Sequence, residues 1–194
     1  MVKIVGVTGG IGSGKTSLMK YAEAQGYVTY YADTEAKKLY EKREIIDRLH
    51  TVFEGADIWT NDNLDRKKLA QVIFSDKDKL IQLNNIIHPA VKQDFENFVT
   101  KHQNEQLILK ESALLFETGA YQSCDYNILI TAPEEIRIQR VMQRDSINRE
   151  EVVKRMENQW KDNEKAKLAD FVVQNIVLEE AQITFLNLLK EIKW

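Results

Sequence analysis

Short apolar runs alternate with amphipathic stretches along most of this chain. Five runs are rich in β-branched or aromatic residues, which predicts strands at 3–8 (KIVGVT), 27–33 (YVTYYAD), 106–112 (QLILKES), 126–131 (YNILIT) and 170–175 (DFVVQN). Amphipathic helix patterns occupy 15–25, 132–145, 149–160 and 179–192. Strands separated by helices indicate a parallel sheet with right-handed crossovers, and therefore an α/β fold.

The interval from Thr34 to His102 interrupts this alternation. Its pattern is largely helical, in segments at 34–40, 45–53, 65–74 and 76–102. We expect the last helix to break at His88–Pro89, because the residue before a proline is pushed away from helical geometry. The interval is too long for one crossover. It therefore predicts a helical subdomain over the carboxyl edge of the sheet, where ligands bind in such folds.

The amino-acid composition limits the kinds of protein that this chain could be. The chain has 194 residues, 43% hydrophobic and 29% charged, which is typical of a globular domain. A net charge of −3, without a long block of Lys or Arg, argues against a nucleic-acid binder. A single cysteine, Cys124, fits a reducing compartment and a packing role, and no apolar run reaches the length of a membrane span. We expect a cytoplasmic protein, either a monomer or a weak homo-oligomer.

The first predicted strand runs into a glycine loop, Gly9–Thr16, with the pattern G-x-x-x-x-G-K-T. Glycines let backbone N–H groups approach a phosphate chain, and a helix that begins near Gly14 adds its positive N-terminal dipole. In this pattern Lys15 reaches the outer phosphates and the Thr16 hydroxyl binds magnesium. The alternative is a glycine-rich turn with a solvated lysine. The position between a strand and a helix favours a nucleoside triphosphate site.

Asp33 ends the second predicted strand. A carboxylate there could orient an acceptor hydroxyl, accept its proton or hold metal-bound water. The alternative is a helix N-cap, since Asp is favoured at that position and a helical segment follows. The residues by themselves leave both interpretations open.

Arg137, Arg140 and Arg144 have the spacing of one helix face. Such a cluster suits a transferring phosphoryl group, and it equally suits a solvated face in which Glu134 pairs with Arg137. His88 lies in an apolar pattern, where a capping or packing histidine is the simpler interpretation. No His, Cys or Asp group has metal-ligand spacing, so a protein-held zinc is not indicated.

Eight segments, in order, resemble the dephospho-CoA kinase family: GVTGGIGSGKTS (6–17), YYADTEAKKLY (30–40), LDRKKLAQVIFSD (64–76), LNNIIHPAV (83–91), ALLFE (113–117), RIQRVMQRD (137–145), REEVVKRMENQW (149–160) and ADFVVQN (169–175). The glycine loop alone is shared by many folds. The combination of DRKKLAQVIF, IIHP and LLFE is far more specific. The resemblance covers nearly the whole chain, from Lys3 to about Asn175.

The resemblance implies ATP-dependent phosphorylation of the ribose 3′-hydroxyl of dephospho-CoA, giving coenzyme A and ADP in the last step of coenzyme A biosynthesis. It also implies a three-layer P-loop NTPase-type parallel sheet, similar to nucleoside-monophosphate kinases. The core would take about 1–33 and 103–194, a helical acceptor subdomain about 34–102, and a lid about 137–160. The expected partners are the small molecules ATP and dephospho-CoA, with Mg²⁺ and without nucleic acid or membrane.

The resemblance also assigns roles to residues. Catalytic roles fall to Asp33 as the base, with Lys15 and Arg140. ATP binding falls to Gly10, Ile11, Gly12, Ser13, Gly14, Lys15, Thr16, Ser17 and Asn175, with magnesium at Thr16. Acceptor binding falls to Thr8, Asp33, Asp65, Arg66, His88, Leu115 and Glu117, and the lid carries Arg137, Arg140 and Arg144.

This chain departs from the family pattern at three positions. Tyr31 replaces a frequent acid, Ala113 a usual proline, and Ile176 a common glycine.

Other interpretations of the function remain open beside the resemblance. One is a kinase of the same fold with another nucleotide or nucleoside acceptor. The others are a nucleotide-dependent switch or motor ATPase, for which Glu111 at the end of LILKES is a weak match, and a binding module without chemistry.

Overall fold

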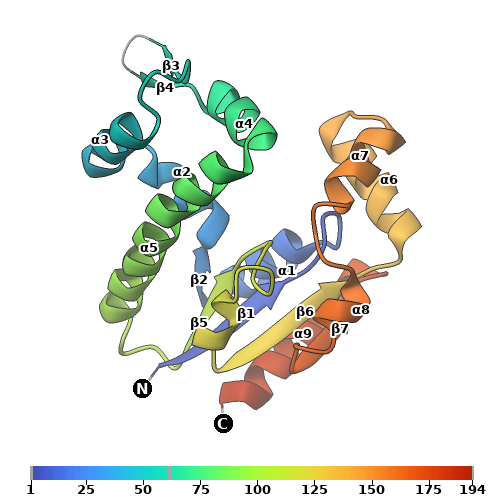
Figure 1. Ribbon diagram of the computed structural model, residues 1–194. Coiled ribbons are helices and arrows are strands. Elements are labelled where there is room, and N and C mark those ends of the chain that lie inside the picture. Colours follow the sequence, from blue (N-terminus) through green and yellow to red (C-terminus); the bar gives the residue numbers. More distant parts are fainter. Residues whose placement is uncertain (1, 61–62, 194) are drawn as a thin grey trace. The chain divides into compact units, whose positions relative to one another are not determined.

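The computed structural model of this chain describes residues 2–60 and 63–193 (Figure 1). The chain divides into two compact units. The first, which we call the sheet unit, comprises Met1–Tyr31 and Lys101–Trp194, and the second, the helical unit, comprises Ala32–Thr100. Each unit has a hydrophobic core of its own.

The sheet unit is built on five parallel strands. They are β1 (Lys3–Thr8), β2 (Val28–Tyr31), β5 (Leu107–Glu111), β6 (Tyr126–Thr131) and β7 (Phe171–Gln174). Their spatial order is β2-β5-β1-β6-β7, with every neighbouring pair parallel. The chain leaves β1 toward one side of the sheet and later fills the other side with β6 and β7. The carboxyl end of β1 is therefore a topological switch point, where ligands bind in open α/β sheets.

Four helices of the sheet unit, at 15–24, 134–145, 149–156 and 178–193, lie where the hydrophobic pattern predicts helices, and two short ones were not predicted. They are α1 (Lys15–Ala24), the 3₁₀ helix η1 (Ala120–Ser123), α6 (Glu134–Asp145), α7 (Arg149–Met156), the short α8 (Asp162–Lys165) and α9 (Leu178–Lys193). The predicted parallel sheet is confirmed, and β1 and β6 have the predicted bounds.

One face of the sheet packs against α1 and α9. Alternate residues of the strands, such as Val5 and Val7 of β1, have no exposed surface and meet Leu18 of α1 and Phe185 of α9. Side chains on successive strand residues point to opposite faces, so this period of two fills one layer of core. The packing fixes α1, and with it the loop that joins β1 to α1.

The described residues of the helical unit form four helices and a short antiparallel ribbon. They are α2 (Ala32–Leu39), α3 (Arg43–Val52), α4 (Arg66–Ser75), α5 (Lys77–Lys101), β3 (Trp59–Thr60) and β4 (Asn63–Leu64). Their core is formed by Ile45, Leu49, Phe53, Ile58, Leu69, Leu83, Ile86 and Ile87. The four predicted helical segments are confirmed in position, whereas the sequence pattern did not predict the ribbon.

The predicted break at His88–Pro89 is wrong, because α5 continues as a helix of 25 residues from Lys77 to Lys101. Pro89 lacks an N–H and removes one helical hydrogen bond. The buried residues Ile86 and Ile87 before it and Phe95 after it lie in the same helix. Burial of this face outweighs the local preference of His88. Within residues 2–60 and 63–193, neither α5 nor another helix combines the length and apolar character needed to cross a membrane.

Candidate active site

The glycine loop Gly9–Thr16 joins the buried end of β1 to the start of α1, as its pattern predicts. Gly12 and Gly14 have φ angles of 80° and 85°, in the left-handed region that favours glycine. The Ser13 N–H donates to the Gly10 carbonyl at 3.0 Å and closes a tight turn within the loop. The loop therefore has one defined backbone conformation.

From Ile11 to Thr16, the Ile11 N–H donates to Gln159 and the Ser13 N–H donates to Gly10, whereas the N–H groups of Gly12, Gly14, Lys15 and Thr16 have no acceptor within the described part of the chain. The N-cap of α1 is Gly14, which has no side chain to satisfy the first turn. Unpaired N–H groups at a helix N-terminus, together with the helix dipole, form an anion site. The loop is thus suited to a phosphate chain.

At two positions of the loop, neighbouring side chains leave no room for a residue larger than glycine. A Cβ on Gly10 would overlap the guanidinium of Arg137, and a Cβ on Gly14 would overlap the side-chain amide of Asn175. Both side chains are buried. The glycine pattern therefore serves two purposes, since it admits phosphate on one side and the protein's own side chains on the other.

Lys15 forms an ion pair with Glu111, with 2.8 Å between Nζ and Oε1. Only 12% of the lysine side chain and 8% of the glutamate side chain are exposed. Glu111 is the last residue of β5, the strand that pairs directly with β1. The sequence offers one signal for this residue, an acid at the carboxyl end of an apolar strand, but that signal by itself is only a weak match to a motor ATPase.

The three arginines of α6 have different surroundings. Arg137 is buried, and its Nε donates to the Ile11 carbonyl at 2.9 Å. Arg140 donates to the main-chain carbonyls of Asn175 and Ile176, at 3.0 and 3.1 Å. Two of the three side chains therefore lie against loops at the carboxyl edge of the sheet.

Arg144, the third arginine, has a largely exposed side chain and donates to Asp145 at 2.7 Å. The same carboxylate accepts from Arg155 of α7 at 2.9 Å. The hydrogen bond from Arg144 lowers the pKa of Asp145. A role of Arg144 in a lid stays a prediction.

Asn175, the residue after β7, is almost fully buried and donates from Nδ2 to the Ser13 carbonyl at 2.8 Å. Its own N–H donates to the Thr131 carbonyl at 2.7 Å. The side chain is thus directed at the glycine loop. The adenine-side role that the resemblance implies stays a prediction.

Three further predicted residues lie in the sheet unit. Thr8 is fully buried at the end of β1, and its hydroxyl has no hydrogen-bond partner within the described part of the chain. Leu115 is fully buried next to Gly6 of β1. Glu117 accepts the Trp160 N–H at 3.1 Å.

Three of the residues described above, Ile11, Arg137 and Glu117, also contact residues between positions 159 and 165 that the sequence pattern does not single out. Gln159 accepts the Ile11 N–H at 2.8 Å, and Asp162 pairs with Arg137 at 3.1 Å. The Nζ of Lys165, which has no exposed surface, lies 2.8 Å from Oε1 of Glu117. The only sequence signal is the family segment that ends at Trp160, since none of these residues has a distinctive spacing.

Two of the residues predicted for the helical unit have structural contacts there. Asp65 caps α4 by accepting the N–H groups of Lys67 and Lys68 at 2.9 and 3.1 Å, and the bond from Lys68 contributes most to lowering the pKa of Asp65. Arg66 donates to the Lys37 carbonyl and to Glu41, both at 2.9 Å. These contacts join α4 to the end of α2.

Asp33 and His88 are the other two predicted residues of this unit. Asp33 is the second residue of α2 and is exposed, two positions after β2 ends. His88 is exposed on α5. Their catalytic and acceptor-binding roles stay predictions.

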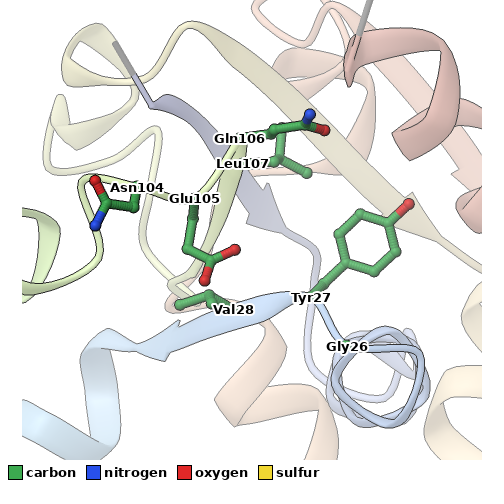
Figure 2. Close-up of a pocket in the computed structure, with 7 residues that line it drawn as sticks. All are labelled: Gly26, Tyr27, Val28, Asn104, Glu105, Gln106 and Leu107. Atoms are coloured by element: carbon green, nitrogen blue, oxygen red, sulfur yellow. The ribbon is translucent and has the colours of Figure 1, made fainter.

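A separate pocket of about 190 Å³ lies at the amino ends of β2 and β5 (Figure 2). Its lining residues are Gly26, Tyr27, Val28, Asn104, Glu105, Gln106 and Leu107. Because the strands are parallel, this is the edge of the sheet opposite to the glycine loop. The pocket contains none of the predicted site residues.

The parallel sheet, the switch point and the glycine loop with its lysine define a P-loop kinase. A family model described as dephospho-CoA kinase matches residues 3–180. A dephospho-CoA kinase of Fusobacterium nucleatum is 36% identical over 174 residues, which are 90% of each chain. The chain therefore belongs to the dephospho-CoA kinase family, and its activity is the final step of coenzyme A biosynthesis.

Two solved structures are similar to this chain over nearly its whole length. The structure of TT1252 from Thermus thermophilus superposes with a TM-score of 0.90 at 32% identity, covering 98% of this chain and 97% of that chain. The dephospho-CoA kinase from Campylobacter jejuni gives a TM-score of 0.72 at 27% identity, covering 100% and 98%. The predicted family and fold class are both confirmed.

The overlap at Gly10 yields a test of the loop packing. Gly10→Ala should lower the free energy of unfolding by about 1–3 kcal/mol, because the new methyl group displaces the Arg137 guanidinium. In an Arg137→Ala background the same change should cost less than about 0.5 kcal/mol, since the space is open. Urea unfolding of the four proteins measures the difference.

Arg144→Ala provides the matched background, because that side chain is largely exposed. Gly10→Ala should remain costly there. Equal costs in all three backgrounds would show that Arg137 does not impose the glycine.

Proposed function

We propose that the glycine loop of this chain binds ATP through its unpaired N–H groups and that the γ-phosphoryl group passes to the ribose 3′-hydroxyl of dephospho-CoA. The observation that carries this proposal is the set of four N–H donors around Lys15 in a chain of the dephospho-CoA kinase family. Family membership implies ATP and a small-molecule acceptor. The remaining assignments concern individual residues.

Lys15 and Arg140 are the proposed cations for the transferring group. The transition state of phosphoryl transfer carries its charge on equatorial oxygens, so catalysis rests on position and electrostatics. Lys15 lies among the unpaired donors, and Glu111 already holds its ammonium group in a mostly buried place. Arg140 is fixed by two carbonyls at the loop after β7.

Magnesium fits the residues that are present. Mg²⁺ prefers oxygen ligands and is usually held by one or two protein groups together with waters and phosphates. Thr16 offers an exposed hydroxyl in the first turn of α1, and Glu111 offers a carboxylate beside Lys15. Within the described residues no cluster of three or more His, Cys, Asp or Glu could hold a metal ion. The bound ion would neutralise charge on the phosphates.

Asp33 is the proposed base for the acceptor hydroxyl. It is an exposed carboxylate in the first turn of α2, two positions after the carboxyl end of β2. The helical unit would then bind the acceptor, with Asp65, Arg66 and His88, and the sheet unit would contribute Thr8, Leu115 and Glu117. A carboxylate close to the hydroxyl accelerates transfer by orienting it and accepting its proton.

The segment 137–160 is the proposed lid. It contains most of α6 and all of α7, and these two helices are joined by the ion pair between Arg149 and Glu135 and by a small apolar core of Ile138, Val141 and Val152. Closure of such a segment would exclude water that otherwise competes as acceptor. Arg144 would move with it.

We further propose that the enzyme acts in the cytoplasm, as a monomer or weak homo-oligomer and without nucleic acid. The support is its composition, with a single cysteine and a net charge of −3.

The deciding experiment incubates the purified protein with ATP, Mg²⁺ and dephospho-CoA and resolves ADP and coenzyme A by chromatography. ADP should appear only with the acceptor, in equal amount to coenzyme A, because transfer requires the 3′-hydroxyl. The 3′-deoxy analogue of the acceptor is the control. ADP formation without acceptor would favour a switch or motor ATPase, and transfer to another nucleotide would favour a kinase with a different acceptor.

Lys15→Ala and Arg140→Ala should each lower kcat at least about a hundredfold, the size of one lost electrostatic contact in the transition state. Lys20→Ala is the matched control, since Lys20 is exposed on the same helix as Lys15. The assay above measures all three. A variant that keeps near-normal turnover removes its residue from the mechanism.

Asp33→Asn should lower kcat by at least about a hundredfold, because the amide cannot accept the proton. The affinity for ATP should be unchanged, as measured by calorimetry. Asp78→Asn, at an exposed position of α5, makes the same charge change elsewhere in the helical unit. A collapse of ATP affinity in Asp33→Asn would instead identify Asp33 as a metal-binding or structural residue.

A further inference from the structure

The N–H groups of the glycine loop alternate between bonded and unpaired. The Ile11 N–H donates to Gln159, and the Ser13 N–H donates to the Gly10 carbonyl. The N–H groups of Gly12 and Gly14, by contrast, have no acceptor within residues 2–60 and 63–193. Contacts elsewhere in the chain must therefore orient the peptide groups so that the N–H groups of Gly12 and Gly14 point away from the protein.

The carbonyl groups that precede the two unpaired N–H groups are both held by side chains. The Ile11 carbonyl accepts from Nε of Arg137 at 2.9 Å, and the Ser13 carbonyl accepts from Nδ2 of Asn175 at 2.8 Å. A trans peptide is planar, so the carbonyl of one residue and the N–H of the next point in opposite directions. Binding the Ile11 carbonyl on the protein side therefore directs the Gly12 N–H outward, and binding the Ser13 carbonyl does the same for Gly14.

Both side chains are themselves fixed. Arg137 pairs with Asp162 at 3.1 Å, and only 8% of its surface is exposed. Asn175 is 1% exposed, and its main chain is bonded to Thr131 and to Arg140. Neither side chain can turn away without leaving a buried polar group unpaired, which is costly.

The side chain of Ile11 adds a third restraint. It packs against the apolar core between α6 and α7, formed by Ile138, Val141 and Val152. Ile11 is thus held by its N–H, by its carbonyl and by its side chain, and all three contacts come from residues 137–159. The orientation of its peptide is set before any ligand arrives.

We propose that Arg137 and Asn175 are positioning residues, each of which orients one N–H group for phosphate binding: Arg137 acts on Gly12 and Asn175 acts on Gly14. The inference deepens the proposed function and rests on it only in that the ligand carries phosphates. Because the donors are held in place, binding does not have to order the loop, and affinity rises accordingly. Asn175 thereby acts on the phosphates through the backbone.

The test uses ¹⁵N-labelled full-length protein titrated with ADP, without dephospho-CoA. In the wild type, the amide signals of Gly12 and Gly14 should both move downfield as their N–H groups bind phosphate. Asn175→Asp replaces the donor with a carboxylate oxygen that repels the Ser13 carbonyl. It should abolish the shift of Gly14 and leave that of Gly12, and it should raise the Kd for ADP about tenfold, the effect of one lost hydrogen bond in a buried position.

Arg137→Lys gives the reciprocal result. Lysine keeps the charge opposite Asp162 but has no donor at the Nε position, so the Ile11 carbonyl loses its partner. The shift of Gly12 should be lost and that of Gly14 kept. Asn187→Asp, at an exposed position of α9, makes the same charge change as Asn175→Asp and should alter neither shift nor Kd.

A purely structural role predicts a different outcome, namely a lower fraction of binding-competent protein with an unchanged Kd and unchanged shifts in that fraction. That result, or equal changes of both glycine signals in either variant, would overturn the assignment. The two variants are independent, so one that does not fold leaves the other to decide. A wild type that shows no shift with ADP would contradict the proposed ATP site itself, which is a separate failure.

Discussion

The structure depends on one constraint at the glycine loop. Protein side chains must pack against one side of the loop, while its other side must stay open to phosphate. Arg137 and Asn175 occupy the protein side so closely that Gly10 and Gly14 cannot carry a Cβ. The same two side chains bind carbonyls of the loop. Since a planar peptide opposes its carbonyl and its N–H, these contacts leave N–H groups on the open side. Packing and phosphate recognition are thus two results of one arrangement.

The strand order of the sheet brings the other residues of the site together. β1 lies in the centre of the sheet with β5 on one side and β6 on the other, so residues far apart in sequence meet at its carboxyl end. Glu111 reaches Lys15 because β5 pairs with β1. Asn175 reaches Ser13 across 162 positions of sequence. The burial of α1 and α9 against one face keeps these ends in register.

α6 and the segment after α7 both contact the glycine loop. Arg137 and Arg140 belong to one helix, yet the first holds the glycine loop and the second holds the loop after β7. Gln159 and Asp162, which follow α7 in the chain, bind Ile11 of the glycine loop and Arg137. Residues at the beginning and at the end of segment 137–160 are therefore bonded to the same residue of the glycine loop, Ile11.

The sequence by itself determined the strands, most helices and the glycine loop, because hydrophobic period and glycine spacing are local properties. It also determined the family, through segments such as 64–76 and 113–117. Only the tertiary structure decided that α5 continues through Pro89, that Glu111 pairs with Lys15, and that Arg137 is buried whereas Arg144 is exposed. Such outcomes depend on which distant side chains pack together, and neither spacing nor propensity contains that information.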